Sequence, residues 1–267
     1  MTTSQTLYSS HNHAMQPVTG VLLVHGLNGS TSDMAELQSI LEARGIVTKN
    51  MILPGHGQRV RDLFAVGWED WAQAVNHELN LLKEQCDEVF LVGHSLGGAL
   101  ALHIAAQEKI AGVVSMCAPL YFHPWLKPAI SLAKYILPFM PNIREDVRDR
   151  EAHRRYKRDV YRWMPMRPVE SMMRYLPQLR AELPHVTAPA LIITSIHDHV
   201  VPARDGREIY RLIGSHEKHL VTLHHSYHVI MKDHDREEVF DKTLAFVLLH
   251  ARNTKLRENQ STADQTA

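Results

Sequence analysis

Residues 89–102 combine an apolar run, a Gly-x-Ser-x-Gly motif centred on Ser95, and a stretch rich in alanine and leucine. This order predicts a buried strand, a sharp turn and a helix, the setting in which a serine is raised above a sheet as a nucleophile. The chain reverses so tightly only where bulky side chains are absent, and Gly93, Gly97 and Gly98 meet that requirement. The alternative is an ordinary strand–turn–helix connection with an incidental serine. We favour the catalytic interpretation of Ser95.

Apolar runs with strand character alternate with amphipathic, helix-like stretches along the chain. Continuous apolar strands that alternate with helices predict an α/β protein with a mostly parallel central sheet covered by helices on both faces. The strand-like runs are 21–24, 89–92, 113–116 and 190–194, with a weaker fifth at 219–223, and the helix-like stretches include 34–43 and 68–83.

Composition restricts the class of protein. Lys plus Arg and Asp plus Glu both number 29, so the net charge gives no reason to expect nucleic acid or an anionic membrane as a partner. No run approaches the roughly 18–20 apolar residues of a membrane-spanning helix, and residues 1–16 lack the apolar core of a signal peptide. We therefore expect a cytoplasmic protein without an integral membrane segment, and, since no heptad or repeat indicates assembly, a monomer.

The 19 histidines and two cysteines do not form a metal motif. The clusters at 197–199 and 224–225 are not joined to cysteine or carboxylate ligands at a familiar zinc spacing. Cys117 lies in an apolar run and is expected to be a small core residue, and nothing indicates a bridge to Cys86. We expect neither a metal nor an organic cofactor.

The segment 120–185 interrupts the alternation of strands and helices. It is rich in aromatic, methionine and charged residues, and five prolines from Pro119 to Pro141 predict that its first part forms short helices. We expect a helical cap inserted over the carboxyl edge of the sheet, where ligands bind in such folds. The resulting organisation is a flexible N-terminus at 1–16, a single domain at 17–251 and a disordered tail at 252–267.

A nucleophilic serine needs a base that takes its proton and an acid that orients the base. On a strand–turn–helix nucleophile, these partners follow the serine in the order acid, then histidine. Asp198 comes just after an apolar strand and occupies the position expected of the acid. The alternative is a turn-forming aspartate that caps the segment at Pro202.

Three histidines compete for the role of base. His224 and His225 stand at the end of the strand-like run at 219–223, and His228 follows in the loop before the last helix. A histidine in that loop can reach over the sheet edge toward Ser95, so we favour His228. A surface or core imidazole is the commoner fate of the other two.

Two main-chain N–H groups are candidates for an oxyanion hole. Leu96 begins the helix after Ser95, and its amide points at the group that the serine attacks. Leu27 follows the strand at 21–24 and Gly26, which allows the backbone to approach closely. We expect His25 to brace this loop rather than to react.

Taken together, these motifs resemble the α/β-hydrolases, and within them the small microbial carboxylesterase and monoacylglycerol lipase family. The resemblance extends over most of the chain and is strongest in seven places. They are Leu23-Val24-His25-Gly26 with Gly29, Pro54-Gly55-His56-Gly57, Asp70-Trp71, Gly93 through Gly98, Gly112-Val113-Val114-Ser115-Met116-Cys117-Ala118-Pro119, His197-Asp198 and Ser226-Tyr227-His228-Val229-Ile230.

By position, the resemblance implies Ser95 as nucleophile, Asp198 as acid, His228 as base, and the amides of Leu27 and Leu96 as oxyanion donors. It implies a serine hydrolase that cleaves short- to medium-chain carboxylic esters through an acyl-enzyme on Ser95, with water as the second substrate. Alternatives are amide or carbon–carbon bond hydrolysis on the same residues, or a non-catalytic binding protein of the same fold.

The sequence departs from that family at Tyr227, where relatives often carry glycine, and in an unusually apolar insertion. The apolar residues of the insertion are candidates for an acyl pocket, although they equally suit the face by which the cap rests on the sheet. These residues are Trp125, Ile136, Leu137, Phe139 and Met140.

Overall fold

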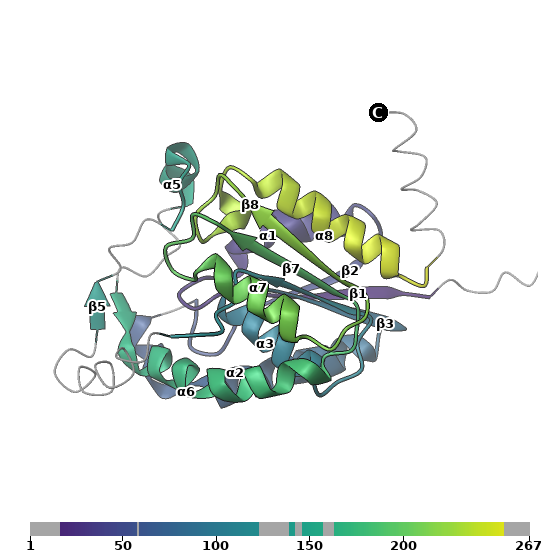
Figure 1. Ribbon diagram of the computed structural model, residues 1–267, viewed down its shortest axis with the longest axis horizontal. Coiled ribbons are helices and arrows are strands. Elements are labelled where there is room, and N and C mark those ends of the chain that lie inside the picture. Colours follow the sequence, from purple (N-terminus) through teal and green to yellow (C-terminus); the bar gives the residue numbers. More distant parts are fainter. Residues whose placement is uncertain (1–16, 58, 123–138, 142–145, 157–162, 254–267) are drawn as a thin grey trace, which may run out of the picture.

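The computed structural model describes residues 17–57, 59–122, 139–141, 146–156 and 163–253 (Figure 1). Its centre is a six-stranded sheet with the order β2-β1-β3-β4-β7-β8, in which every neighbouring pair is parallel. This confirms the predicted sheet. The strands are β1 (Thr19–Val24), β2 (Val47–Met51), β3 (Glu88–His94), β4 (Gly112–Met116), β7 (Ala190–Ser195) and β8 (Lys218–Leu223).

Helices cover both faces of the sheet, as the apolar strands predict (Figure 1). Alternate side chains of β1 face opposite layers: Val21 and Leu23 pack with one set of helices, and Leu22 and Val24 with the other. The first layer contains α1 (Ala35–Glu42) and α8 (Arg236–His250), and the second contains α2 (Trp68–Lys83), α3 (Leu96–Ala105), α6 (Met166–Glu182) and α7 (Ala203–Leu212). The described residues also form the 3-10 turns η1 (Thr31–Asp33), η2 (Val60–Ala65), η3 (Leu183–His185) and η4 (Ile230–Lys232).

The edge strand β2 is not predicted from the sequence, because only one of its side chains is buried. Its sequence, Val-Thr-Lys-Asn-Met, alternates between exposed and half-buried positions before Met51 enters the core. An edge strand pairs on one side only, so it carries little of the continuous apolar character that reveals central strands.

The segment 120–185 does not lie over the sheet edge as a whole. α6 packs against α2 and α3, and its residues Met172, Leu176 and Leu179 join the core beneath the sheet. Pro177 lies inside this helix without ending it. Two other parts of the segment lie toward the carboxyl ends of the sheet strands (Figure 1). They are α5 (Arg150–Tyr156) and an antiparallel strand pair, β5 (Phe139–Pro141) and β6 (Trp163–Pro165). The described part of this segment therefore contains a short strand pair besides its helices, one of which packs beneath the sheet, and the extent of the cap stays a prediction.

The first two residues of the expected disordered tail are held in place. Arg252 donates from its backbone and its guanidinium to Glu88, whose buried carboxylate also accepts from Thr19, and Asn253 donates to the carbonyl of Pro17. The expectations for residues 1–16 and for the tail beyond 253 concern residues outside the described ranges. Within those ranges, no helix is both long and apolar enough to cross a bilayer.

Candidate active site

Ser95 lies on a strained turn between β3 and α3. Its φ of 53° and ψ of −117° are unusual for a residue with a side chain, and such strain persists only where the surroundings enforce it. A Cβ on Gly97 would lie 2.2 Å from the carbonyl oxygen of Val24, and one on Gly93 would lie 2.1 Å from that of Gly97. The Ser95 N–H donates to the carbonyl of Met116 at 2.8 Å. The glycines therefore permit the close packing that holds the hydroxyl at the carboxyl end of the sheet.

Ser95, His228 and Asp198 form a continuous hydrogen-bonded chain. The Ser95 Oγ lies 2.9 Å from Nε2 of His228, and Nδ1 of His228 lies 2.7 Å from Oδ2 of Asp198. These partners favour the tautomer in which Nδ1–H donates to the carboxylate and Nε2 accepts from the hydroxyl. The three side chains that the sequence analysis selected are thus brought together in the order that nucleophile activation requires.

The Asp198 carboxylate makes both kinds of contact that its sequence position suggested, one with the candidate base and one within its own turn. While Oδ2 faces His228, Oδ1 accepts from the N–H groups of Val200 and Val201 at 2.7 and 2.8 Å. Burial alone would raise the pKa of Asp198, but the facing imidazole and these hydrogen bonds together lower it below its ordinary value. The acid is therefore an ionised carboxylate that also caps its own turn.

The geometry distinguishes among the three competing histidines. His224 and His225 are exposed, whereas His228 is buried beside Ser95. The carbonyl of His228 also accepts from Nε2 of His94, at 2.9 Å, and the two rings are 4.8 Å apart. Burial lowers the pKa of His94 to about 4, so this residue next to Ser95 is neutral. Its hydrogen bond to the carbonyl of His228 supports the backbone of the candidate base.

The two candidate oxyanion donors come from neighbouring loops. Leu96 is the first residue of α3, so its N–H is outside the hydrogen-bond ladder of the helix. Leu27 lies in a tight loop after β1 that is closed by a bond from Gly29 N–H to the carbonyl of Gly26. His25 braces that loop as expected, because Nδ1 lies 2.8 Å from the Gly26 carbonyl and Nε2 accepts from Leu53 N–H.

A second buried histidine, His56, supports the same loop. Its Nε2 accepts from the N–H of Asn28, which has a left-handed φ of 69°, and its Nδ1 lies 3.2 Å from the carbonyl of Pro54. Trp71 Nε1 donates to that same carbonyl. Burial lowers the pKa of His56 to about 4, so a neutral imidazole links the two loops beside Leu27.

Comparison with known proteins identifies the family. The model for the serine aminopeptidase S33 family matches residues 15–235. The chain belongs to this family. It is 30% identical over 233 residues to a thermostable monoacylglycerol lipase of Bacillus sp. (strain H-257), covering 87% of this chain and 91% of the relative. A carboxylesterase of Bacillus subtilis (strain 168) is 26% identical over 228 residues, with coverages of 85% and 91%.

A solved structure supports the same family assignment. It comes from work on LipS and LipT, two metagenome-derived lipolytic enzymes, and matches this chain with a TM-score of 0.81 at 32% identity. The match covers 88% of this chain and 95% of that one. The α/β-hydrolase fold and the resemblance to microbial carboxylesterases and monoacylglycerol lipases are thereby confirmed.

In this S33 protein, Cys117 lies beside the acid. Its Sγ, a carboxylate oxygen of Asp198 and a ring nitrogen of His228 all lie within 4.8 Å of one another. Burial, and then the Asp198 carboxylate, raise the pKa of the thiol well above its ordinary value. Cys117 is thus a protonated, buried thiol, in agreement with its expected role as a small core residue, and like Cys86 it is unbridged.

The acyl-pocket candidates are only partly described. Trp125, Ile136 and Leu137 lie outside the described residues, and Met140 is described by its backbone alone. The ring of Phe139 contacts that of Phe64 on η2, with centroids 4.7 Å apart. The acyl pocket therefore stays a prediction.

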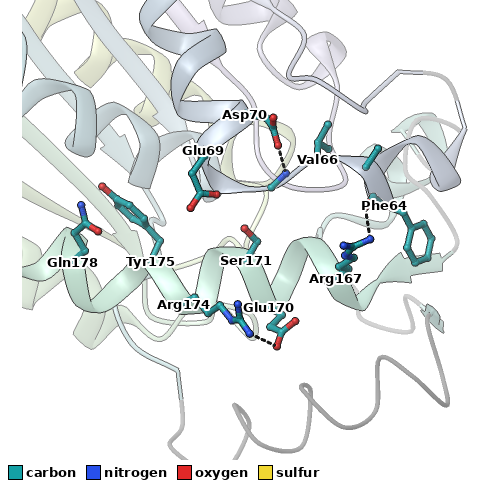
Figure 2. Close-up of a pocket in the computed structure, with 12 residues that line it drawn as sticks. Phe64, Val66, Glu69, Asp70, Arg167, Glu170, Ser171, Arg174, Tyr175 and Gln178 are labelled. Carbon is teal, nitrogen blue, oxygen red and sulfur yellow. Dashed lines mark hydrogen bonds and ion pairs between the residues drawn. The ribbon is translucent and has the colours of Figure 1, made fainter.

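A polar pocket of about 530 Å³ lies between η2, the start of α2 and α6 (Figure 2). Arg167 extends from α6 toward Phe64 and donates to its carbonyl, whereas Arg174 pairs with Glu170 on the side of α6 that faces away from α2 (Figure 2). Its lining residues come from these elements and not from the loops that carry the serine, the acid and the base. We therefore do not place the reacting ester there.

Sequence analysis missed His56 and His94 as supports of the site. Both stand inside the quoted motifs, but a histidine in such a motif carries no signal of which main-chain group it bonds. The partner of His94 lies 134 residues further along the chain, so only the folded structure reveals that contact.

Proposed function

We propose that this S33 protein is a carboxylic ester hydrolase in which Ser95 is the nucleophile, His228 the base and Asp198 the acid. The observation that carries the proposal is the hydrogen-bonded chain from Ser95 Oγ through His228 to Asp198, with distances of 2.9 and 2.7 Å. The names of its lipase and carboxylesterase relatives support an ester as the substrate.

In the proposed reaction, His228 accepts the Ser95 proton as the hydroxyl oxygen attacks the ester carbonyl. The amides of Leu27 and Leu96 stabilise the developing oxyanion, and each such donor contributes about 2.7–4 kcal/mol to the transition state. His228 then protonates the departing alcohol, leaving an acyl group on Ser95. Asp198 holds the imidazole in the required tautomer throughout and stabilises its charged form.

Water completes the cycle. His228 removes a proton from a water molecule, whose oxygen attacks the acyl carbonyl, and the serine oxygen leaves and regains its proton from the imidazole. The products are a carboxylic acid and an alcohol. Every proton transfer uses the same ring nitrogen, Nε2, and no cofactor is required.

We propose monoacylglycerols and other short- to medium-chain esters as the substrate class, on the strength of the monoacylglycerol lipase relative. The description of the family as serine aminopeptidases makes amide hydrolysis the second candidate. A panel of p-nitrophenyl esters, monoacylglycerols, long-chain triglyceride emulsions and aminoacyl amides separates these possibilities. A maximum on the triglycerides or on the amides would contradict the proposed substrate class.

The chemistry itself is tested by Ser95→Ala. We expect this variant to lose turnover of p-nitrophenyl butyrate by about 10⁴-fold or more and to lose labelling by a fluorophosphonate probe. Asp198→Asn should retain labelling at a much reduced rate, because the nucleophile remains while the tautomer is lost. Near-normal turnover by Ser95→Ala would refute the mechanism, and an unlabelled wild-type protein would favour a binding protein of the same fold.

We also propose that the protein acts in the cytoplasm as a monomer, with small esters and water as its only partners. The balanced charge, which gives no reason to expect nucleic acid or an anionic membrane as a partner, supports this proposal. Cell fractionation and sedimentation at micromolar concentration test the two parts separately.

A further inference from the structure

The loop that carries the base, residues 224–235, is tied to the cap by one buried carboxylate. Asp233 is only 2% exposed. Its Oδ2 accepts from Tyr227 N–H in the base loop and from Arg148 N–H, at 2.8 and 2.7 Å, and its Oδ1 accepts from Asp149 N–H at 2.9 Å. A single side chain thus bonds main-chain groups of two segments that are far apart in sequence.

The tie continues to the residue next to the base. The N–H of Val229 donates to the carbonyl of Asp146 at 2.9 Å. Residues 146–149, which we call the cap segment, immediately precede α5. This segment supplies the Asp146 carbonyl that Val229 bonds and the two N–H groups, of Arg148 and Asp149, that Asp233 accepts from. On the surface, the Arg148 guanidinium lies over the Tyr227 ring, 5.8 Å from its centroid. The cap segment is therefore bound on either side of His228.

The opposite side of the base loop is bound to the oxyanion loop instead. Lys232, which is 3% exposed, forms an ion pair with Asp33 and lies 3.3 Å from the hydroxyl of Ser32. Asp33 and Ser32 belong to η1, which follows the loop with Leu27. Neighbouring residues of opposite charge, Lys232 and Asp233, thus bind the base loop to two different walls of the site.

We propose that Asp233 is a positioning residue that couples the cap segment to His228, so that a substrate that engages the cap also sets the alignment of the base. This inference rests on the proposed ester hydrolysis. Loss of the Asp233 bonds loosens the cap segment, which then keeps the bond from Val229 N–H to Asp146 and the bond from the Arg148 guanidinium to the carbonyl of His225. The base loop as a whole stays held on its other side by Lys232. We expect this coupling to affect substrates whose acyl group is long enough to reach the cap segment more than substrates with a short acyl group.

Two variants remove the tie from its two ends. Asp233→Asn keeps the size of the side chain but loses its charge and one acceptor oxygen. Arg148→Pro removes the N–H donor from the cap segment, and Arg148→Ala is its matched control because it keeps that N–H while losing the exposed guanidinium. Steady-state kinetics on p-nitrophenyl acetate and p-nitrophenyl octanoate, with melting temperatures, are measured for each variant and for the double variant of Asp233→Asn with Arg148→Pro.

We expect Asp233→Asn to lower kcat on the octanoate by about tenfold or more, as fits the loss of charge-assisted hydrogen bonds. The loss on the acetate should be smaller, so that the octanoate-to-acetate ratio of kcat/KM falls below that of the wild type. Arg148→Pro should reduce this ratio beyond the effect of Arg148→Ala. The double variant should lose no more than the worse single variant, because both changes remove the same interaction.

A purely structural Asp233 would lower the melting temperature and leave the octanoate-to-acetate ratio unchanged. Folded variants with this ratio within about twofold of wild type, or losses that simply add, would overturn the coupling. If Asp233→Asn does not fold, the comparison of Arg148→Pro with Arg148→Ala on an intact Asp233 decides. A wild-type protein without esterase activity would overturn both proposals, whereas an active wild type with unaltered variants overturns the coupling alone.

Discussion

Gly97→Ala is expected to displace the loop that supplies one oxyanion donor. The added Cβ would lie 2.2 Å from the carbonyl oxygen of Val24 and 2.6 Å from that of His25. Even favourable carbon–oxygen contacts are about 3.3–3.6 Å long, so the helix start and the loop must separate by about 1 Å. Both proposed oxyanion amides lie on these two segments, that of Leu96 on one and that of Leu27 on the other.

The size of the effect follows from this displacement. Misplacing a catalytic group by about 1 Å costs about 100-fold in rate, equivalent to about 2.7 kcal/mol of activation free energy. Overpacking costs a further 1–3 kcal/mol, roughly, of folding free energy. In a chain of this size, that corresponds to a fall in melting temperature of about 2–12 °C. Well below its melting temperature, the variant should therefore stay folded while its rate falls by about 100-fold.

The assay measures kcat on p-nitrophenyl butyrate, well below the melting temperature of each variant, together with thermal unfolding. Gly45→Ala is the matched control: Gly45 has a φ of 77° and nothing within 4 Å of an added Cβ. It should lose about 1–2 kcal/mol of stability through backbone strain alone and retain its kcat. The reasoning is refuted if Gly97→Ala keeps a kcat within a few-fold of wild type, or if the control loses as much activity.

Three further predictions concern buried ionisable side chains. Burial lowers the pKa of His56 and His94 to about 4, so the unfolded chain binds more protons between about pH 6.5 and 4. The free energy of unfolding then has its full value above about pH 6.5 and falls with acidification by as much as about 1.4 kcal/mol per pH unit for each histidine. Urea unfolding at several pH values measures this dependence. The free energy of unfolding should depend less steeply on pH in His56→Gln than in the wild type, and equal slopes would contradict the prediction. Lys232→Met should lower the free energy of unfolding in urea by about 3–5 kcal/mol, because it leaves Asp33 buried without its ammonium partner. Adding Asp33→Asn should restore part of the loss. Additive losses would exclude the ion pair as the cause. Because its thiol pKa is raised, Cys117 should resist iodoacetamide at pH 8 until urea unfolds the protein, as mass spectrometry can establish.

The central strands were predictable because both of their faces are buried, which leaves a continuous apolar signal in the sequence. β2 was not, since an edge strand needs only Met51 in the core. The packing partner of α6 was not predictable for a different reason. Its apolar residues are spaced for a helix whether it covers the active site or packs against α2, and periodicity does not name the partner surface.

The candidate site was predictable where chemistry restricts the order of residues along the chain. Ser95 followed from its turn, and Asp198 and His228 from their places after later strands. Choosing His228 over His224 needed only the reach of a loop residue. The residues that hold these groups, such as Asp233, were not predictable, because a carboxylate that binds main-chain N–H groups leaves no trace in spacing or composition.

The reacting groups are far apart in the sequence, so the chemistry depends on how far synthesis and folding of the chain have proceeded. Ser95 and His228 touch although 133 residues separate them, and Asp198 arrives on a third loop. On the proposed mechanism, a growing chain that has emerged only as far as β7 carries a serine with no base, and such a hydroxyl does not attack esters. Regain of activity during refolding should then lag behind collapse and helix formation, since it waits for the long-range pairing of β4 with β7 and for the base loop that follows β8. The enzyme is switched on by the completion of its own fold.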